Sequence, residues 1–375
     1  MQLEIWHNLA WSRYKGGVFT ALARQAPARG ADVEIVQIAL TDGRRAALSD
    51  VAQARFDYPH EILFRQSYDD ISRWRLMRRV WRRAWSSKAD LTIIAGVDRP
   101  EYWLQALILT LRGRKRAVFF DSTRFDRPQR PWRNLAKRLF FKLVPWTLSY
   151  GERARDYAIS LGIRPERALQ RVQAAYLPPE YNEQDIAEQR APQAGRFLFV
   201  GRLAPEKELD TLVEAFARYA AGDIGAQLRI VGAGPEEAGL RNLARQHGVD
   251  GRIAFVGPLQ DDALVREYLA ANALVLPSRS EPWGLVVNEA LHYGCPVIVS
   301  DRCGCVPELV AGSDCGIVFP HGDAAALEQA LRTARTRFDE PVSTAQRCLL
   351  AVAPFSSEKA AAQILDAAER VLGKD

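Results

Sequence analysis

Two glutamates eight residues apart, with a glycine between them, form the most chemically informative segment of the chain. The segment reads SEPWGLVVNEA and contains Glu281, Gly284 and Glu289. A helix that begins near Gly284 points free N–H groups and its positive dipole end at whatever lies in front of it, so a phosphate fits there. A carboxylate can accept hydrogen bonds from two neighbouring hydroxyls, so each glutamate suits a sugar ring. The alternative is an ordinary helix whose dipole favours a nearby glutamate.

Two permanent cations follow an apolar run that ends at Gly201. Arg202 and Lys207 lie in the loop after FLFVG, beyond the expected carboxyl end of a strand. Two such cations suit a diphosphate, because phosphate oxygens accept charge-assisted hydrogen bonds. The alternative is that the cations only pair with Glu206 or Glu208. This segment alone leaves both interpretations open.

Further glycines follow expected strands. Gly16 and Gly17 precede a helix expected from Val18, where they would let N–H groups approach an anion. The segments RIVGAGP and IAFVGP, the second ending in Gly257 and Pro258, repeat this strand–turn pattern. They are either plain turns or backbone contacts to a base or phosphate. No full G-x-G-x-x-G is present, so a dinucleotide fingerprint is absent.

In this order, these segments resemble the nucleotide-sugar domain of the family 4 retaining glycosyltransferases with GT-B architecture. The resemblance rests on GR…K, VGAGP, VGP, SEPWGLVVNEAL, GCPVIVSDRCG and VPELV and covers about residues 195–320. The N-terminal half resembles the family only in outline. The resemblance implies that Arg202 and Lys207 hold the donor diphosphate. It also implies that Glu289 binds the ribose hydroxyls and Glu281 the transferred sugar. The implied donor-binding residues are Gly16, Gly17, Gly201, Arg202, Lys207, Gly257, Pro258, Glu281, Trp283, Gly284, Leu285, Val286 and Glu289.

The acceptor side departs from the family pattern. Relatives carry a His after an N-terminal strand, near the reacting sugar, whereas the segment VFFDSTR places Asp121 or Ser122 there. The usual P-N-G-V-D segment is replaced by YLPP at 176–179. We expect the five His to be structural, with His292 near the donor helix. The candidate catalytic residues are Glu281, Arg202, Lys207 and Asp121.

The reaction implied is transfer of a hexose-type sugar, with retained configuration, from a nucleoside diphosphate to a saccharide or lipid-linked saccharide. The cations and the helix end would stabilise the charge on the leaving phosphate. We expect no metal and no cofactor, since no D-x-D pattern is present. The rival interpretations are a nucleotide-sugar epimerase, a catalytically silent sugar-nucleotide-binding protein, and a nucleic-acid binder, which would not need the carboxylates. We expect no nucleic-acid partner.

Short β-branched runs alternate with helical stretches in both halves, which is typical of α/β proteins with parallel sheets. We expect the GT-B fold: two doubly wound, Rossmann-like domains facing each other across a cleft. The polar, proline-containing segment 176–194 reads as a linker. The expected domains are residues 1–190 for the acceptor and 191–355 for the nucleotide sugar, with 356–375 as a helix packing back on the first. The expected strands are 3–6, 33–39, 91–95, 117–121, 147–150, 197–200, 227–231, 253–256, 273–276, 296–299 and 316–318.

Charge is unevenly distributed along the chain. Residues 1–195 hold 33 Lys and Arg against 21 Asp and Glu, a net charge of +12, and eight of the nine Trp; the remainder has a net charge of −6. Segments 71–88 and 131–146 place Trp and Leu at helical spacing between Arg and Lys, which suits an anionic membrane surface. The alternative is that the stripes pack on the sheet and the arginines face water.

The composition limits the class of protein. The chain has 375 residues, of which 48% are hydrophobic and 26% charged, as in ordinary globular proteins. We find no apolar run of membrane-spanning length and no signal peptide, and expect a cytoplasmic protein, peripheral on the inner face of the plasma membrane. The five Cys have no C-x-x-C or zinc-finger spacing, so we expect buried, reduced thiols.

Overall fold

The computed structural model describes residues 1–10, 12–43, 57–126, 130–178 and 180–373. The chain divides into two compact units. Unit 1 comprises residues 1–124, 128–176 and 356–375, and unit 2 comprises 125–127 and 177–355. The change between units therefore falls at residues 176/177 rather than at the expected 190/191.

Unit 1 is built on a seven-stranded sheet in the order β3-β2-β1-β4-β5-β6-β7, in which every neighbouring pair is parallel. The first strand lies inside the sheet, and the strand order reverses between β1 and β4. The elements are β1 (Gln2–Leu9), α1 (Arg13–Gln25), β2 (Asp32–Thr41), β3 (His60–Ser67), α2 (Arg73–Ser86), β4 (Leu91–Ile94), α3 (Pro100–Leu111), β5 (Lys115–Phe120), α4 (Pro131–Leu143), β6 (Thr147–Tyr150), α5 (Gly151–Ser160), β7 (Ala168–Arg171) and α13 (Ser357–Leu372).

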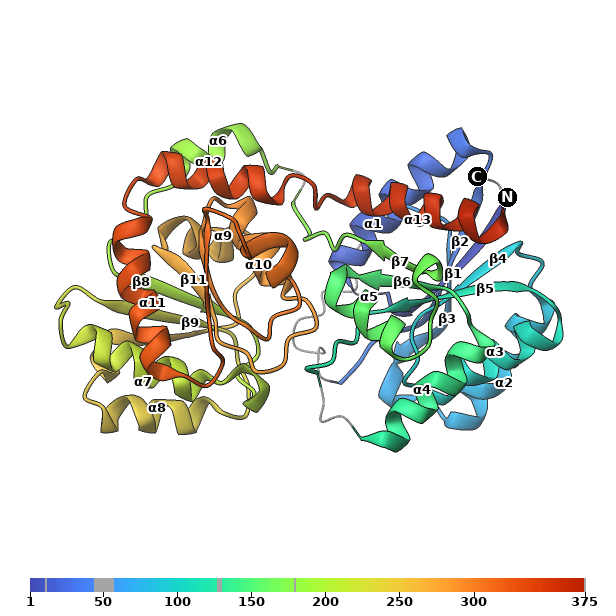
Figure 1. The fold of residues 1–375 in the computed structure, drawn as a ribbon, viewed down its shortest axis with the longest axis horizontal. Coiled ribbons are helices and arrows are strands. Elements are labelled where there is room, and N and C mark those ends of the chain that lie inside the picture. The colour runs from blue at the N-terminus through green and yellow to red at the C-terminus, as the bar shows by residue number, and fades with distance from the viewer. Residues whose placement is uncertain (11, 44–56, 127–129, 179, 374–375) are drawn as a thin grey trace. The chain divides into compact units, whose positions relative to one another are not determined.

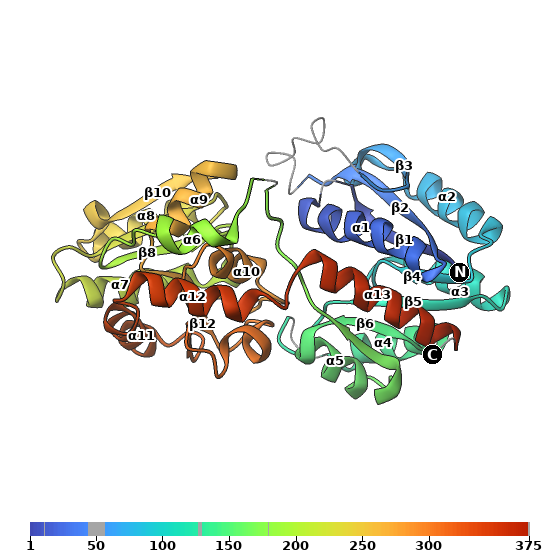
Figure 2. The ribbon, with the colours of Figure 1, turned by 90° about the horizontal axis from the view of Figure 1, so that it is seen from above.

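Helices cover both faces of this sheet. On one face, α1 and the C-terminal α13 lie side by side and share a core with inward-facing residues of β1, β4 and β5 (Figure 2). On the other face, α2, α3, α4 and α5 contribute to a second core. The alternation of inward side chains along each strand supplies both cores, which is why the strands are almost continuously apolar.

Unit 2 repeats the design with six parallel strands in the order β10-β9-β8-β11-β12-β13. Here the order reverses between β8 and β11. Helices α7, α8 and α11 cover one face, and α9 and α10 with α6 and α12 the other (Figure 1). The elements are α6 (Glu183–Gln189), β8 (Arg196–Val200), α7 (Leu209–Ala220), β9 (Gln227–Val231), α8 (Glu237–Gln246), β10 (Ile253–Gly257), α9 (Asp261–Ala270), β11 (Ala273–Leu276), α10 (Leu285–His292), β12 (Val297–Ser300), β13 (Gly316–Phe319), α11 (Ala324–Arg337) and α12 (Pro341–Val352).

The expected α/β class with two doubly wound parallel sheets is confirmed. All the expected strands are present, but sequence analysis missed β3 and β7. The expected linker contains α6, whose N-cap Asn182 accepts a hydrogen bond from the Gln184 amide. Pro179 of this linker lies outside the described residues. No helix in the described residues combines the length and apolar character needed to cross a bilayer.

Candidate nucleotide-sugar site

Two loops meet at the carboxyl edge of the unit 2 sheet. Strands β8 and β11 are hydrogen-bonded neighbours, so the loops that follow them leave from the same edge. This is the point where the strand order reverses, and ligands of doubly wound sheets bind there. The two loops are joined by a backbone hydrogen bond of 3.1 Å from the Arg279 amide to the Glu206 carbonyl.

Lys207, in the loop after β8, forms an ion pair with Glu281, in the loop after β11. Both side chains are mostly buried, with exposed fractions of 16% and 15%. Both residues are expected in the site from the sequence, with Glu206 and Glu208 as the alternative partners of the lysine. The structure instead brings the two candidate residues into contact, from positions that are 74 residues apart.

The backbone around Glu281 is held in place by the segment that follows β12. Residues 281 and 303 form a parallel β-bridge, and the Gly304 amide donates to the Glu281 carbonyl at 2.8 Å. The Cys305 amide donates to the Trp283 carbonyl at 3.0 Å. A Cβ on Gly304 would overlap the Pro282 carbonyl, so only glycine permits this approach. The SEPWG loop is therefore supported along its length.

Helix α10 begins directly after Gly284. This N-cap residue has φ of +102°, a left-handed conformation that favours glycine, and it turns the chain into the helix. As at any helix start, the first N–H groups have no partner within the helix. They therefore form a partial positive charge beside Glu281, whose Cγ is 3.5 Å from the position of a Cβ on Gly284.

The side chain of Trp283 points into the core of unit 2. Its indole is buried, packs on Phe355 and donates from Nε1 to Asn288 Oδ1 at 2.7 Å. Asn288 is itself fully buried. The tryptophan anchors the loop to the core, and its part in donor binding remains a prediction.

Glu289 lies one turn into α10 and faces helix α9. The Tyr268 hydroxyl donates to Glu289 Oε2 at 2.8 Å. Burial raises the pKa of Glu289 to about 7, although the hydrogen bond from Tyr268 opposes the rise. Among the described residues, Glu289 is hydrogen-bonded to Tyr268 and Glu281 is paired with Lys207, so the two glutamates of the motif have different partners within unit 2.

Arg202 is paired with Glu206 on the surface, as the alternative interpretation allowed. The two side chains are about half exposed, and such pairs contribute at most about 1 kcal/mol. A phosphate could therefore replace Glu206 as the partner at little cost. The glutamate itself has a lowered pKa; burial opposes the shift, but a backbone hydrogen bond and Arg202 outweigh it.

The glycine turns have a packing role. A Cβ on Gly232 would overlap the Gly201 carbonyl, and one on Gly234 would overlap the Leu203 carbonyl. These close approaches hold the loop after β8 in place. The Gly257 carbonyl accepts a hydrogen bond of 2.9 Å from the Gly232 amide, while its own Cβ position is open. Contacts of Gly257 and Pro258 to a base remain a prediction.

In unit 1, Gly16 and Gly17 do not form a turn before a helix. Helix α1 already begins at Arg13, so both glycines lie within it. The Gly16 amide donates to the Ser12 carbonyl at 2.9 Å and is thus occupied. A Cβ on Gly17 would lie 3.0 Å from Ser357 Oγ, so this glycine lets α13 pack closely on α1. The expected turn is wrong, because the helix starts one turn earlier than its apolar pattern indicated.

Asp121 follows β5 at the carboxyl edge of the unit 1 sheet and is exposed. The surrounding protein and the nearby Asp98 raise its pKa, while Lys15 opposes the rise. The lysine is buried and hydrogen-bonded to the Tyr150 hydroxyl. The guanidinium of the buried Arg171 lies 4.1 Å from the centroid of the Tyr150 ring. Burial, with Arg171, holds the pKa of Lys15 well below its usual range.

The group formed by Lys15, Tyr150 and Arg171 is not predicted from the sequence. Each residue follows or ends a different strand, and no local spacing connects them. Of these three residues, Lys15 acts on Asp121, where it opposes the rise in the pKa of the carboxyl. Arg171 in turn helps to lower the pKa of Lys15.

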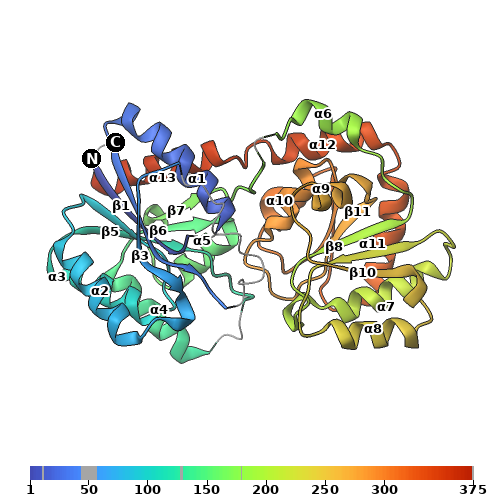
Figure 3. The same ribbon diagram turned by 180° about the vertical axis from the view of Figure 1, so that it is seen from behind.

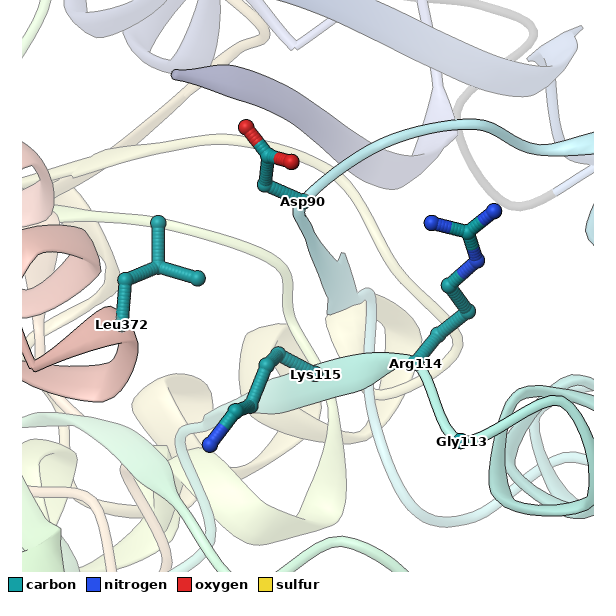
Figure 4. A pocket seen from close by; sticks show the side chains of 5 residues that line it. All are labelled: Asp90, Gly113, Arg114, Lys115 and Leu372. Atoms are coloured by element: carbon teal, nitrogen blue, oxygen red, sulfur yellow. The ribbon is translucent and has the colours of Figure 1, made fainter.

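The remaining candidates do not form sites. A pocket of about 320 Å³ in unit 1 is lined by Asp90, Gly113, Arg114, Lys115 and Leu372, whose side chains point in different directions (Figure 4). It lies at the amino ends of β4 and β5, away from Asp121.

Within the described ranges, no group of three or more His, Cys, Asp or Glu could hold a metal ion. The five Cys are buried and free, as expected. Burial lowers the pKa of His292 to about 4, which fits a structural role.

Comparison with known proteins agrees with this architecture. Residues 181–337 match the family model described as Glycosyl transferases group 1. A glycogen synthase of Mycobacterium tuberculosis is 33% identical over 190 residues, which are 48% of this chain and 45% of that protein. The chain thus spans less than half the length of this curated relative.

Solved structures match over nearly the whole chain. Anabaena HepE, solved with UDP and glucose, has a TM-score of 0.70 at 16% identity, covering 98% of this chain and 99% of that one. The lipopolysaccharide outer core galactosyltransferase WaaB has a TM-score of 0.66 at 15% identity, with the same coverage. At these identities the likeness shows the fold. The chain therefore has the GT-B fold, and its residues 181–337 are similar to the glycosyl transferases group 1 family.

Proposed function

We propose that the protein is a retaining, metal-independent glycosyltransferase that moves a hexose-type sugar from a nucleoside diphosphate to a saccharide or lipid-linked saccharide acceptor. Its place would be cell-surface polysaccharide synthesis at the inner face of the plasma membrane. The observation that carries the proposal is the contact of Lys207 with Glu281 beside the start of α10, at the reversal point of the unit 2 sheet.

In this proposal, unit 2 binds the donor. The N–H groups at the start of α10 and Lys207 hold the diphosphate, and Arg202 exchanges Glu206 for a phosphate oxygen. Glu281 orients the sugar hydroxyls, and Glu289 accepts hydrogen bonds from the ribose. UDP and glucose in HepE support a donor of the UDP-sugar class.

During transfer, the bond between the anomeric carbon and the phosphate oxygen breaks, and a bond to the acceptor hydroxyl oxygen forms. Lys207, Arg202 and the helix dipole stabilise the negative charge on the leaving phosphate, and one such donor contributes about 3–4 kcal/mol. The hydroxyl proton passes to the leaving phosphate on the same face. Asp121, whose pKa is raised, lies at the unit 1 sheet edge as the alternative proton acceptor.

The test is release of UDP from UDP-glucose by the full chain, with saccharide acceptors and with EDTA present. Lys207→Met should reduce kcat by about 100-fold or more, because charge on the leaving phosphate is no longer neutralised. Arg241→Gln, which removes a surface ion pair on α8, is the matched control. Product NMR shows whether the anomeric configuration is retained. Donor binding without turnover for any acceptor would instead support the sugar-nucleotide-binding protein.

A further inference from the structure

Helices α2, α3 and α4 of unit 1 expose large apolar side chains together. The three helices lie close together in unit 1 (Figure 3), and α3 packs against both α2 and α4. Trp103 of α3 contacts Phe140 of α4 edge to face at 5.2 Å, and Arg112, just after α3, stacks over Trp85 of α2 at 5.9 Å. We call the solvent-exposed side of these three helices the tryptophan–leucine face.

On α2, the tryptophans lie on the side opposite the core. The helix packs on the sheet through Leu76, Val80 and Ala84. Trp74 is 74% exposed, and Trp81 and Trp85 stack on each other and are about half exposed. The alternative interpretation, in which the tryptophan stripe packs on the sheet, is therefore wrong for this helix.

The other two helices extend the same surface. Helix α4 buries Phe140 and Phe141 and exposes Trp132, Leu135 and Leu139. Leu107 and Leu111 of α3 are also exposed, the second by 73%. Single exposed apolar residues are common, but several on adjacent helices form a patch that marks an interaction site.

The charges around this face are almost all positive. Along α2, Arg78 and Arg82 lie between the tryptophans at helical spacing, and Arg73 precedes them. Among the described residues, these three arginines have no ion pair with a carboxylate. Arg83 differs, because its side chain is mostly buried and paired with Glu4, Glu34 and Glu61. The basic residues exposed on α4 are Arg138 and Lys142.

From this surface we propose that unit 1 docks, through its tryptophan–leucine face, on a membrane containing anionic lipids. Tryptophan favours the boundary between headgroups and acyl chains, leucine enters the acyl region, and unpaired arginines bind lipid phosphates. An extended apolar surface flanked by positive charges complements the surface of an anionic membrane. The proposal deepens the function above by naming where a lipid-linked acceptor would be presented, but its test does not depend on turnover.

The test is flotation of the full chain with phosphatidylcholine vesicles, with and without phosphatidylglycerol. Each basic residue near an anionic surface contributes a factor of about five. The triple variant Arg73→Gln, Arg78→Gln and Arg82→Gln should therefore bind anionic vesicles on the order of 100-fold more weakly. Trp74→Ser with Trp85→Ser should also weaken binding, and it should reduce the blue shift of tryptophan fluorescence on adding vesicles.

The matched control is Ile224→Ser with Leu350→Ser, which removes two exposed apolar residues from unit 2 and should leave binding unchanged. UDP-glucose affinity, measured by calorimetry, should be the same in every variant, which separates this proposal from the proposed function. The proposal is overturned if the full chain does not bind anionic vesicles. It is also overturned if the arginine and tryptophan variants bind anionic vesicles as tightly as the Ile224→Ser, Leu350→Ser control. It is also overturned if the face instead mediates self-association in gel filtration or binds RNA at physiological salt.

Discussion

The raised pKa of Glu289 predicts that donor binding depends on pH near neutrality. The pKa is about 7, against an ordinary value of 4.5, because the carboxyl is surrounded by protein. Two ribose hydroxyls can both donate to an ionised carboxylate, whereas a protonated carboxyl has one oxygen that donates instead. The ionised fraction is roughly one tenth at pH 6 and nine tenths at pH 8, so the Kd for the donor should fall about tenfold over this range.

Calorimetry with UDP-glucose measures this directly, because its diphosphate diester does not titrate between these pH values. Glu289→Gln should bind more weakly at pH 8 and show no such pH dependence. Tyr268→Phe removes the hydrogen bond that lowers the pKa of Glu289, so its binding transition should move to higher pH. The assignment of Glu289 to the ribose would be refuted if the Kd of the native chain did not change between pH 6 and pH 8. It would also be refuted if the Kd of Glu289→Gln changed with pH as much as that of the native chain.

The same shift has a consequence for stability. Because the folded-state pKa of Glu289 is raised, its contribution to stability is fully present below pH 4.5 and is lost as pH rises through about 7. At pH 8, Glu289→Gln should therefore be more stable than the native chain, by up to about 3 kcal/mol. The difference should vanish near pH 4. Urea unfolding at several pH values measures it, and a variant less stable at pH 8 would contradict the burial argument.

Three further substitutions test the framework around the site. Gly304→Ala should destabilise the chain by more than about 1 kcal/mol in urea unfolding and weaken donor binding, because its Cβ overlaps the Pro282 carbonyl. Gly239→Ala is the matched control: its Cβ meets open space on α8, so it should stabilise the chain by about 0.5–1 kcal/mol. Arg83→Gln should lower the free energy of unfolding by about 3–5 kcal/mol, because it leaves the buried Glu4 without its guanidinium partner. Equal stability of either destabilising variant and the native chain would contradict the packing described.

Most strands could be predicted from the sequence because they lie inside the sheets. Interior strands of parallel sheets are buried on both faces and read as continuous apolar runs. The two missed strands, β3 and β7, lie at the edges of the unit 1 sheet. Residues His60–Ser67 mix exposed and buried positions, and Ala168–Arg171 has only four residues. Half-exposed, short segments do not give a clear apolar pattern.

The site could be predicted residue by residue, but not its contacts. Lys207 and Glu281 were selected from two local motifs, whereas their pairing depends on β8 and β11 being neighbours. The sequence shows no such neighbourhood, because the strands between them occupy the far side of β8. The burial of Trp283 could not be predicted for a related reason. Its hydrogen bond to the buried Asn288 depends on how the loop packs on α10.

The topology of unit 1 relates the proposed membrane-docking face to the sheet edge that carries Asp121. In a doubly wound sheet, each helix begins at the carboxyl edge of the strand before it and returns along the sheet. Trp74 near the start of α2 and Trp132 near the start of α4 therefore lie toward the edge that carries Asp121. Trp85 and Leu111 lie toward the opposite end. A bilayer on the tryptophan–leucine face would contact the helices along their length and reach the sheet edge that carries Asp121, the proposed alternative proton acceptor.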